Sequence, residues 1–423
     1  MRRAALVVVI AALAGPAAAD DLTLADLKWP TTTRSAITRW RAHVVDAAGG
    51  RRVGVLVRGA RVAWKRIVGA RDHCGAWLEL EPRGYACAHD LKPSDEDVVP
   101  TIVDQAPIER WADVKKDGAD AYDSPDDITA GAVARVVPDK TFVAVKANAR
   151  SVKLGGVRYV KTDQGWIASD RLSWYEPSEF AGLELATTAP PSWPFAWIVP
   201  HRHGAKVIVR DDNGAELREL AARDVVAVIS VRGPQVQIAT GEWIDRDDVR
   251  IADKTSRPDG VGDHDKWLDV SLDEQVLIAY EGDTPVFATL VSTGRKRWET
   301  PTGIYRVAGK YARVRMQDPG GMADEWNVAD VPWTMRFRKN FALHGTYWHD
   351  GFGRARSHGC VNLSPSDAHR LYAWTTPDVP DGWSEAEASA DDATGTPVRI
   401  RSARDPDPIW RRFDGKPLAP IDP

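Results

Sequence analysis

The chain has 423 residues, of which 43% are hydrophobic and 27% are charged, and this composition excludes an intrinsically disordered protein. A formal net charge of −4 without a long basic run also excludes a typical nucleic-acid-binding protein. The length predicts roughly two to four domains. The 18 tryptophans indicate several small cores, each built around one or two large rings.

Residues 1–19 have the composition of a secretory signal peptide. Arg2 and Arg3 supply the charged start, and the apolar run Ala4–Ala14 is too short to span a bilayer. Small residues then offer a cleavage site near Ala19. We therefore expect a secreted protein of the periplasm or cell envelope, with no membrane span after cleavage. A retained N-terminal anchor is the alternative.

Three segments that follow this leader share one pattern. Each begins with short β-branched runs and ends in a glycine, an aromatic residue and an Asp-containing turn. The aromatic recurs roughly every 80 residues, which is typical of tandem small domains. The runs predict small antiparallel β-barrels, after an irregular lead-in at 20–37. These modules are expected at 38–98, 127–178 and 195–252, with the closing aromatics Tyr85, Trp166 and Trp243.

The closing segment of each module resembles the last strand of bacterial SH3-like domains. In similar envelope proteins such modules bind wall polymer or position a catalytic domain, so wall glycan is an expected partner. A plain spacer role is an equal alternative, because large aromatic rings are most often buried in cores.

The three cysteines divide into a pair and a single residue. Cys74 and Cys87 are close enough in sequence to close one small loop in an oxidising compartment, and we expect a disulfide between them. Cys360 is then left alone. An unpaired cysteine in an exported protein indicates a function for its thiol, and a buried inert thiol is the alternative.

Residues 265–402 have the pattern of one larger, β-rich domain, followed by a short tail at 403–423. The sequence Glu281-Gly282-Asp283 predicts a hairpin turn between two of its strands. The expected strands are 267–272, 275–280, 287–291 and 396–400. The chain as a whole is therefore predicted to be mainly β.

One short helix is expected in this domain, directly after Cys360. Ser364 is its predicted cap, Pro365 its first residue and Asp367 an acid at its positive end, and the helix continues to Trp374. Because its N-terminus lies close in sequence to Cys360, its dipole is expected to favour the thiolate.

The chemistry is concentrated between Leu343 and Leu363. His344-Gly345 opens this stretch, and Ser357-His358-Gly359-Cys360-Val361-Asn362 closes it. A thiol reacts as the thiolate, which forms near neutral pH only beside a base or a positive potential, and a histidine is such a base. Glycines let backbone N–H groups approach a developing oxyanion.

This pattern resembles the L,D-transpeptidase catalytic domain of the YkuD family, over about a third of the chain from near Lys266 to near Arg401. The segment Thr300-Pro301-Thr302-Gly303-Ile304-Tyr305 matches a turn common in that family. The resemblance implies an enzyme of cell-wall biogenesis, an acyltransferase that reworks peptidoglycan stem peptides through a cysteine thioester.

The resemblance also implies roles for the motif residues. Cys360 is the nucleophile and His344 the base, and the backbone carbonyl of Gly345 fixes the tautomer of that histidine. His358 supports the site and ranks second as a proton handler. Ser357 holds the turn by hydrogen bonding, and the N–H groups of Gly359 and Cys360 are the expected oxyanion hole.

The expected substrate-binding residues are less specific. Asn362 stands where many family members have arginine, which leaves open how the donor is held; Arg354 and Arg356 are candidates, with a solvated loop as their alternative. Tyr347 and Trp333 complete the set. The cluster of Trp326, Trp333 and Met335 either lines the peptide groove, as in the family, or belongs to the core.

By this resemblance the enzyme attacks the third residue of a tetrapeptide stem, and D-Ala leaves. An amine on another stem, a protein lysine or water then resolves the thioester, so an L,D-carboxypeptidase is one alternative function. A non-catalytic wall-binding protein is another. We expect no metal or organic cofactor, although His344, His349, His358 and Cys360 are potential zinc ligands.

Overall fold

The computed structural model describes residues 21–101, 110–145, 150–202, 204–317, 327–388 and 394–418. The predicted signal peptide lies outside these ranges. Two compact units divide the chain, Met1–Thr101 and Ile102–Pro423, and each is considered by itself. Within the described ranges, no helix is both long enough and apolar enough to cross a membrane.

The first unit is a small antiparallel β module. Strands β1-β6-β7-β8-β3-β4 follow one another in one sheet and β5-β2-β9 form another. The Cys74–Cys87 disulfide packs against Val45, Val68 and Trp77, which confirms the predicted pair. The elements are β1 (Asp21–Leu22), β2 (Ser35–Thr38), β3 (Ala42–Val45), β4 (Arg52–Leu56), β5 (Arg61–Val62), β6 (Trp64–Gly69), β7 (Ala76–Leu80), β8 (Tyr85–Cys87), the 3-10 turn η1 (Ala88–Asp90) and β9 (Leu91–Ser94).

The predicted lead-in at 20–37 is wrong, because it contains β1 and most of β2. Strand β2 lies between β5 and β9, and its residues Ala36 and Thr38 are buried. Four residues with two hydroxyl side chains give no hydrophobic periodicity, so the pairing of this strand was not visible in the sequence.

A second module begins the second unit and has the same arrangement of strands. Its sheets are β13-β10-β17 and β12-β11-β16-β15-β14. The predicted start at 127 is wrong, because β10 and β11 precede it. The elements are β10 (Arg110–Val114), β11 (Ala119–Tyr122), α1 (Pro125–Ala130), β12 (Arg135–Val137), β13 (Phe142–Val145), β14 (Ser151–Leu154), β15 (Val157–Thr162), β16 (Gly165–Ala168), η2 (Ser169–Arg171) and β17 (Leu172–Trp174).

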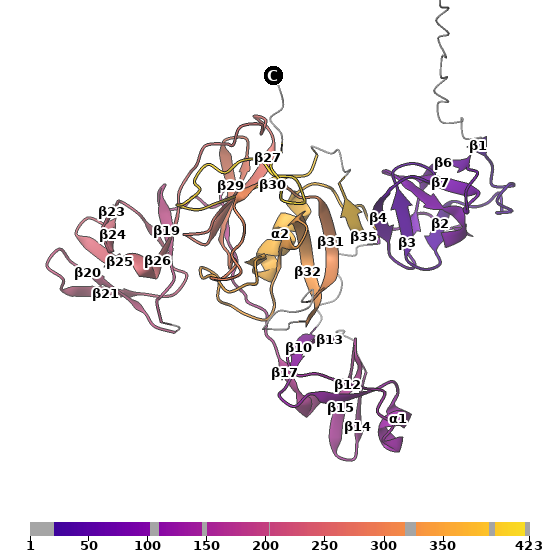
Figure 1. Ribbon diagram of the computed structural model, residues 1–423, viewed down its shortest axis with the longest axis horizontal. Coiled ribbons are helices and arrows are strands. Elements are labelled where there is room, and N and C mark those ends of the chain that lie inside the picture. The colour runs from indigo at the N-terminus through magenta and orange to yellow at the C-terminus, as the bar shows by residue number, and fades with distance from the viewer. Residues whose placement is uncertain are drawn as a thin grey trace, which may run out of the picture. The chain divides into compact units, whose positions relative to one another are not determined.

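The third module repeats this topology, with sheets β22-β19-β26 and β21-β20-β25-β24-β23 (Figure 1). In all three modules a 3-10 turn precedes the last strand, which pairs with the first strand of the smaller sheet. The repeat is therefore structural; its SH3-like character stays a prediction. The elements are β19 (Phe195–Ile198), β20 (Val207–Arg210), β21 (Glu216–Leu220), β22 (Val225–Ala227), β23 (Ser230–Arg232), β24 (Gln235–Ala239), β25 (Glu242–Asp245), η3 (Arg246–Asp248) and β26 (Val249–Ala252).

The remaining domain consists of two sheets and one helix around a common core. One sheet has the order β18-β29-β28-β27-β36-β30, and the other contains β35-β31-β32-β33-β34. Helix α2 packs against β32 and β33 (Figure 1). The elements are β18 (Leu183–Glu184), β27 (Lys266–Ser271), β28 (Val276–Glu281), β29 (Thr284–Leu290), β30 (Gly303–Arg306), β31 (Gly309–Gln317), β32 (Asn327–Arg338), β33 (Phe341–Gly345), β34 (Val361–Leu363), α2 (Pro365–Trp374), β35 (Trp383–Glu387) and β36 (Pro397–Arg401).

Local predictions for this domain are confirmed where the sequence carried turn and cap signals. The turn after Glu281 joins β28 to β29. The Ser364 hydroxyl accepts a hydrogen bond from the Asp367 N–H and Pro365 is the first residue of α2. At the other end of α2, the buried Lys310 donates to the Thr375 carbonyl at 2.7 Å, where a cation offsets the negative end of the helix dipole.

The predicted tail at 403–423 is wrong for the residues up to 418. Trp410 forms a bridge with Ile304 and its indole N–H donates to the Asp259 carbonyl at 2.8 Å. The ring packs against the core that contains Trp267 and Tyr280. One large aromatic residue thus anchors a segment whose proline and aspartate content had indicated an irregular end.

Candidate active site

The register of two parallel strands brings the motif histidine and cysteine to one face of a sheet. Strand β33 pairs with β34 so that Leu343 lies opposite Val361 and His344 opposite Asn362. Leu343 and Val361 enter the core, so His344 and Asn362 point to the opposite face, because side chains alternate along a strand. Cys360 precedes Asn362 by two positions and therefore lies on the same face as His344.

His344 is a buried, neutral base with a fixed tautomer. Only 2% of its surface is exposed, and its Nδ1 lies 3.0 Å from the Gly345 carbonyl oxygen, as predicted. The carbonyl can only accept, so Nδ1 carries the proton and Nε2 is left as an acceptor. Burial lowers the pKa of His344 to about 4, although the bond to Gly345 acts in the opposite direction.

Cys360 is a thiol, rather than a thiolate, in the resting site. Burial raises its pKa to about 11, and the Ala342 backbone and the Arg336 charge only partly oppose this. The predicted help from the α2 dipole stays a prediction, and distance weakens it. Three residues of β34 separate the thiol from the helix, roughly 10 Å of strand, whereas the dipole field falls off within the first turn.

The residues from Ser357 to Cys360, here called the catalytic turn, are held by one hydroxyl. Ser357 Oγ donates to the Cys360 carbonyl at 2.6 Å and accepts from the Gly359 N–H at 3.0 Å, which confirms the role predicted for Ser357. The expected oxyanion donor at Gly359 is wrong, because this N–H is already used. The Cys360 N–H remains the candidate from that pair.

Any residue other than glycine would be strained at position 359 of this turn. Its φ is +122°, and a Cβ would lie 2.6 Å from Cε1 of Phe341, so both strain and a clash would follow. Its carbonyl accepts from Thr300 Oγ1 at 2.7 Å. The threonine of the predicted Thr-Pro turn thus holds the residue before Cys360.

His358 is bound to an arginine. Its Nε2 lies 3.0 Å from Nη2 of Arg295, and Trp298 packs edge-on at 4.9 Å between ring centroids. A guanidinium only donates, so Nε2 of His358 accepts and cannot take a second proton while this bond lasts. We therefore assign His358 to support of the turn rather than to proton transfer.

His349 is a residue that the sequence offered only as a zinc ligand. Its Nδ1 accepts from the Gly351 N–H at 3.2 Å, and its Nε2 lies 3.0 Å from the Asn362 amide. Burial, with the charge of Arg356 adding to it, lowers the pKa of His349 to about 4. The neutral ring therefore carries its proton on Nε2, and only the oxygen of Asn362 can receive it.

This orientation decides what Asn362 offers to a ligand. The other atom of its amide is buried without a partner among the described residues. With the oxygen turned to His349, that atom is the NH2 group, a donor on the face that carries Cys360. The supporting role of His349 could not be predicted from the spacing of residues in the sequence, because it depends on a contact with Asn362 on β34.

The two arginines predicted to hold substrate lie in different settings. The Arg354 guanidinium donates to the carbonyls of Pro200 and, at 3.2 Å, His201 in the third module, so it serves as a tie between domains. Arg356 is exposed, and its guanidinium covers Gly351, where a Cβ would lie 2.3 Å from Nε. Only Arg356 stays a candidate for substrate contact.

Tyr347 was predicted to bind substrate, and this prediction is wrong. Only 1% of its surface is exposed; its hydroxyl donates to the Ala329 carbonyl at 2.7 Å, and its ring stacks on Trp111 of the second module at 4.3 Å. Met335 is likewise core. Trp333 is partly buried against the same core and lies 5.0 Å from the His369 ring, whereas Trp326 lies outside the described residues.

The loop between the two motif halves, residues 346–354, is packed by the second and third modules; we call it the module-facing loop. On one side Phe142 packs against Tyr347 and Trp348. On the other side Asp350 pairs with Arg223, and Arg250 Nε donates to the Gly353 carbonyl at 2.6 Å. The loop that leads away from His344 is thus fixed by residues from outside the catalytic domain.

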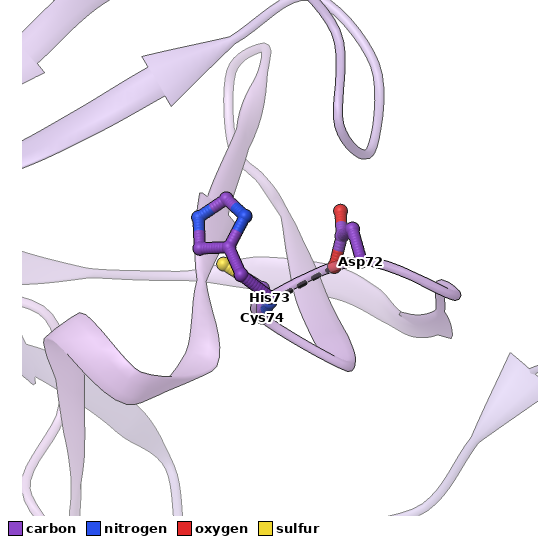
Figure 2. A group of neighbouring side chains, drawn as sticks. All are labelled: Asp72, His73 and Cys74. Carbon is purple, nitrogen blue, oxygen red and sulfur yellow. Dashed lines mark hydrogen bonds between the residues drawn. The ribbon is translucent and has the colours of Figure 1, made fainter.

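A group with the chemistry of metal ligands lies in the first module, where Asp72, His73 and Cys74 come together (Figure 2). The Cys74 sulfur is bound to Cys87, and the Asp72 carboxylate accepts from the Cys74 N–H at 2.9 Å and the Trp77 indole at 2.8 Å. These contacts describe a capped turn beside a disulfide, and the residues do not fit a zinc site.

Residues 265–400 match the sequence model of the YkuD family, described as the L,D-transpeptidase catalytic domain. None of the curated proteins matches the chain. The matched segment contains β27 to β36 apart from the last residue, and so all of the motif residues described above.

Several solved structures are also similar. A mutant of the L,D-transpeptidase from Enterococcus faecium is 21% identical, and the match covers 32% of this chain and 50% of that chain with a TM-score of 0.26. An L,D-transpeptidase from Xylanimonas cellulosilytica is 22% identical, and the match covers 36% of this chain and 64% of that chain with a TM-score of 0.24. L,D-transpeptidase 3 from Mycobacterium tuberculosis, in complex with a faropenem-derived adduct, is 16% identical, and the match covers 50% of this chain and 92% of that chain with a TM-score of 0.26. This chain thus spans about half the length of the Enterococcus faecium protein.

Proposed function

We propose that the protein is a peptidoglycan L,D-transpeptidase with Cys360 as its nucleophile, because residues 265–400 match the sequence model of the L,D-transpeptidase catalytic domain. Its donor is a tetrapeptide stem, and its place is the cell envelope outside the membrane. The observation that carries the proposal is the parallel register that puts Cys360 and His344 on one face, with His344 Nδ1 held by the Gly345 carbonyl at 3.0 Å.

The first half of the reaction moves one proton and forms one thioester. As Sγ of Cys360 attacks the carbonyl carbon of the third stem residue, its proton passes to Nε2 of His344. The Gly345 carbonyl then stabilises the imidazolium through Nδ1–H, as the third member of a triad does. When the tetrahedral intermediate collapses, the bond to D-Ala breaks, and the imidazolium gives its proton to the leaving amine.

The depressed pKa of His344 and the raised pKa of Cys360 favour a neutral thiol and a neutral imidazole at rest. Proton transfer therefore accompanies attack instead of preceding it. The Cys360 N–H is the donor that this proposal assigns to the developing oxyanion.

In the second half an amine attacks the thioester carbonyl, gives its proton to His344 and releases the thiol. If the amine belongs to another stem the product is a 3→3 cross-link, and if it belongs to a protein the product is a tethered protein. Water in the same place gives an L,D-carboxypeptidase. The three modules then serve to hold the catalytic domain near wall glycan.

The test is release of D-Ala from a synthetic tetrapeptide stem by the full chain without residues 1–19, with and without an added amine acceptor. Wild type is expected to release D-Ala and, with acceptor, to form the coupled peptide. Cys360→Ala and His344→Ala should lose both, whereas His264→Ala, which changes an exposed histidine, should retain both. Turnover by Cys360→Ala at the wild-type rate would overturn the proposal.

A further inference from the structure

A basic loop lies along the catalytic turn. Residues 294–300 are tied to it at three points: Gly294 forms a bridge with Ser357, the Arg295 N–H donates to the Ser357 carbonyl at 3.1 Å, and Thr300 Oγ1 donates to the Gly359 carbonyl at 2.7 Å. A turn within the loop is closed by the Trp298 N–H, which donates to the Arg295 carbonyl at 2.9 Å. The loop therefore has a fixed position beside the nucleophile.

Three consecutive cations, Arg295, Lys296 and Arg297, occupy this loop, and they are not equivalent. The Arg295 guanidinium is bound to His358 at 3.0 Å and lies over Trp298 at 4.3 Å. Its role is therefore to support the catalytic turn. Lys296 and Arg297 are exposed. Neither of these two has an ion-pair partner among the residues that the structure describes.

Of these two residues, Arg297 is also held in a defined direction. Arg297 has a φ of +87°, an unusual conformation for a residue with a side chain, and such outliers are concentrated at functional sites. Its guanidinium lies 5.2 Å from the Trp298 ring centroid, and Trp298 in turn packs on His358. An aromatic platform thus links the cation directly to the catalytic turn.

We propose that Lys296 and Arg297 bind a carboxylate of the donor peptide, close to the bond that is cleaved; this inference rests on the proposed function. A tetrapeptide stem carries carboxylates at its terminal residue and on its internal acidic residues, and cations paired with no protein carboxylate are suited to receive one. Arg354, the other basic candidate, is engaged by Pro200 and His201. The loop thereby makes the enzyme selective for stems with free carboxylates.

The test measures equilibrium binding of the tetrapeptide to the full chain carrying Cys360→Ala, which removes chemistry from the readout. Lys296→Gln with Arg297→Gln is compared with Lys153→Gln and Arg158→Gln, a pair of exposed cations that face each other across β14 and β15. The loop variant should bind about two- to thirtyfold more weakly, the range for two exposed charge pairs. The β14–β15 variant should bind as tightly as the parent. Lys296→Arg with Arg297→Lys should restore binding.

Two further donors identify the carboxylate, one amidated at the terminal residue and one amidated at an internal acid. The donor that lacks the recognised group should bind the parent and the loop variant equally. If all three donors show the same loss, or if none shows any, the proposal is overturned. Because binding is measured without Cys360, a lack of turnover in wild type would count against the proposed function alone.

Discussion

The two halves of the motif are supported by different parts of the molecule. The catalytic turn is held inside its own domain, by Phe341 against Gly359, Thr300 on the Gly359 carbonyl and Arg295 on His358. The module-facing loop is held by Trp111 and Arg223, which belong to the second and third modules. Cys360 is thus positioned by its own domain, whereas the segment that follows His344 depends on the modules.

This difference indicates that the second and third modules help to position the module-facing loop, apart from the wall attachment that we propose for them. The module-facing loop begins two residues after His344 and contains His349, which orients Asn362. A displaced module would therefore disturb the base and the amide donor first and leave the catalytic turn intact. The predictions below test this asymmetry, from the largest expected effect to the smallest.

The largest effect is expected for Trp111→Ala. This ring is only 6% exposed and stacks on Tyr347 at 4.3 Å, so its removal leaves a cavity and should cost about 3–5 kcal/mol of unfolding free energy. Denaturant unfolding followed by fluorescence measures this loss. Trp40→Ala, where the ring is 52% exposed, is the control and should cost much less. Equal losses for the two variants would contradict the role of Trp111.

Acid should lower the unfolding free energy of the chain, because His344 and His349 are buried in the neutral form. The pKa values of His344 and His349 are lowered to about 4 in the folded chain, so the unfolded chain binds more protons between that value and 6.5. Stability is fully present above pH 6.5 and is lost as the pH falls towards 4, by an amount on the order of 3 kcal/mol for each histidine.

The measurement is the denaturation midpoint between pH 7 and pH 4.5. His349→Gln should flatten this dependence, whereas His264→Gln, at an exposed position, should leave it unchanged. A slope that is the same in wild type and His349→Gln would show that this histidine is not buried neutral in the fold.

Two glycine substitutions form a matched pair across the two halves. Gly359→Ala places a Cβ 2.6 Å from Phe341, and Gly353→Ala places one 2.8 Å from Val199 of the third module, both at positive φ. Each should cost about 1–3 kcal/mol. Val199→Ala should recover part of the loss in Gly353→Ala and none of that in Gly359→Ala.

Activity should separate the same two variants. D-Ala release should fall at least a hundredfold in Gly359→Ala, because the nucleophile itself is moved, and much less in Gly353→Ala. If Gly353→Ala lost as much activity as Gly359→Ala, the claim that the catalytic turn is held independently of the modules would fail.

The smallest effect is expected for Tyr347→Phe. The stacked ring remains, and only the hydrogen bond of the hydroxyl to the Ala329 carbonyl, 2.7 Å long, is removed. A lost buried hydrogen bond costs about 1 kcal/mol. Unfolding should report this loss with unchanged affinity for the tetrapeptide, whereas a weaker affinity would return Tyr347 to the substrate-binding set.

Local signals made several features of the fold predictable. The turn at Gly282, the cap at Ser364 and the Cys74–Cys87 pair follow from residues close together in sequence, and each is found where expected. The placement of Cys360 and His344 on one face follows from the parallel register of two short strands. The strand pairing itself was not visible in the sequence, but the resemblance of the His344 and Cys360 motif to that of the family predicted that the two residues lie close together.

Contacts between distant segments were not predictable. Tyr347 in a glycine-containing loop resembles a ligand contact until Trp111 covers it, and Arg354 resembles a substrate cation until its carbonyl partners in the third module are known. The dipole of the helix that follows Cys360 in sequence was expected to favour its thiolate. Burial decides its pKa instead, and burial is a property of the assembled domain.

The most direct test of the account is the intact mass of the chain after brief mixing with a tetrapeptide stem, followed by mapping of any adduct. The account predicts a mass gain equal to the stem without its D-Ala, located on the peptide that contains Cys360 and absent from Cys360→Ala. Such an adduct should form more slowly in His344→Ala. An adduct that persists in Cys360→Ala, or one that maps to another residue, would contradict the assignment of Cys360 as the nucleophile.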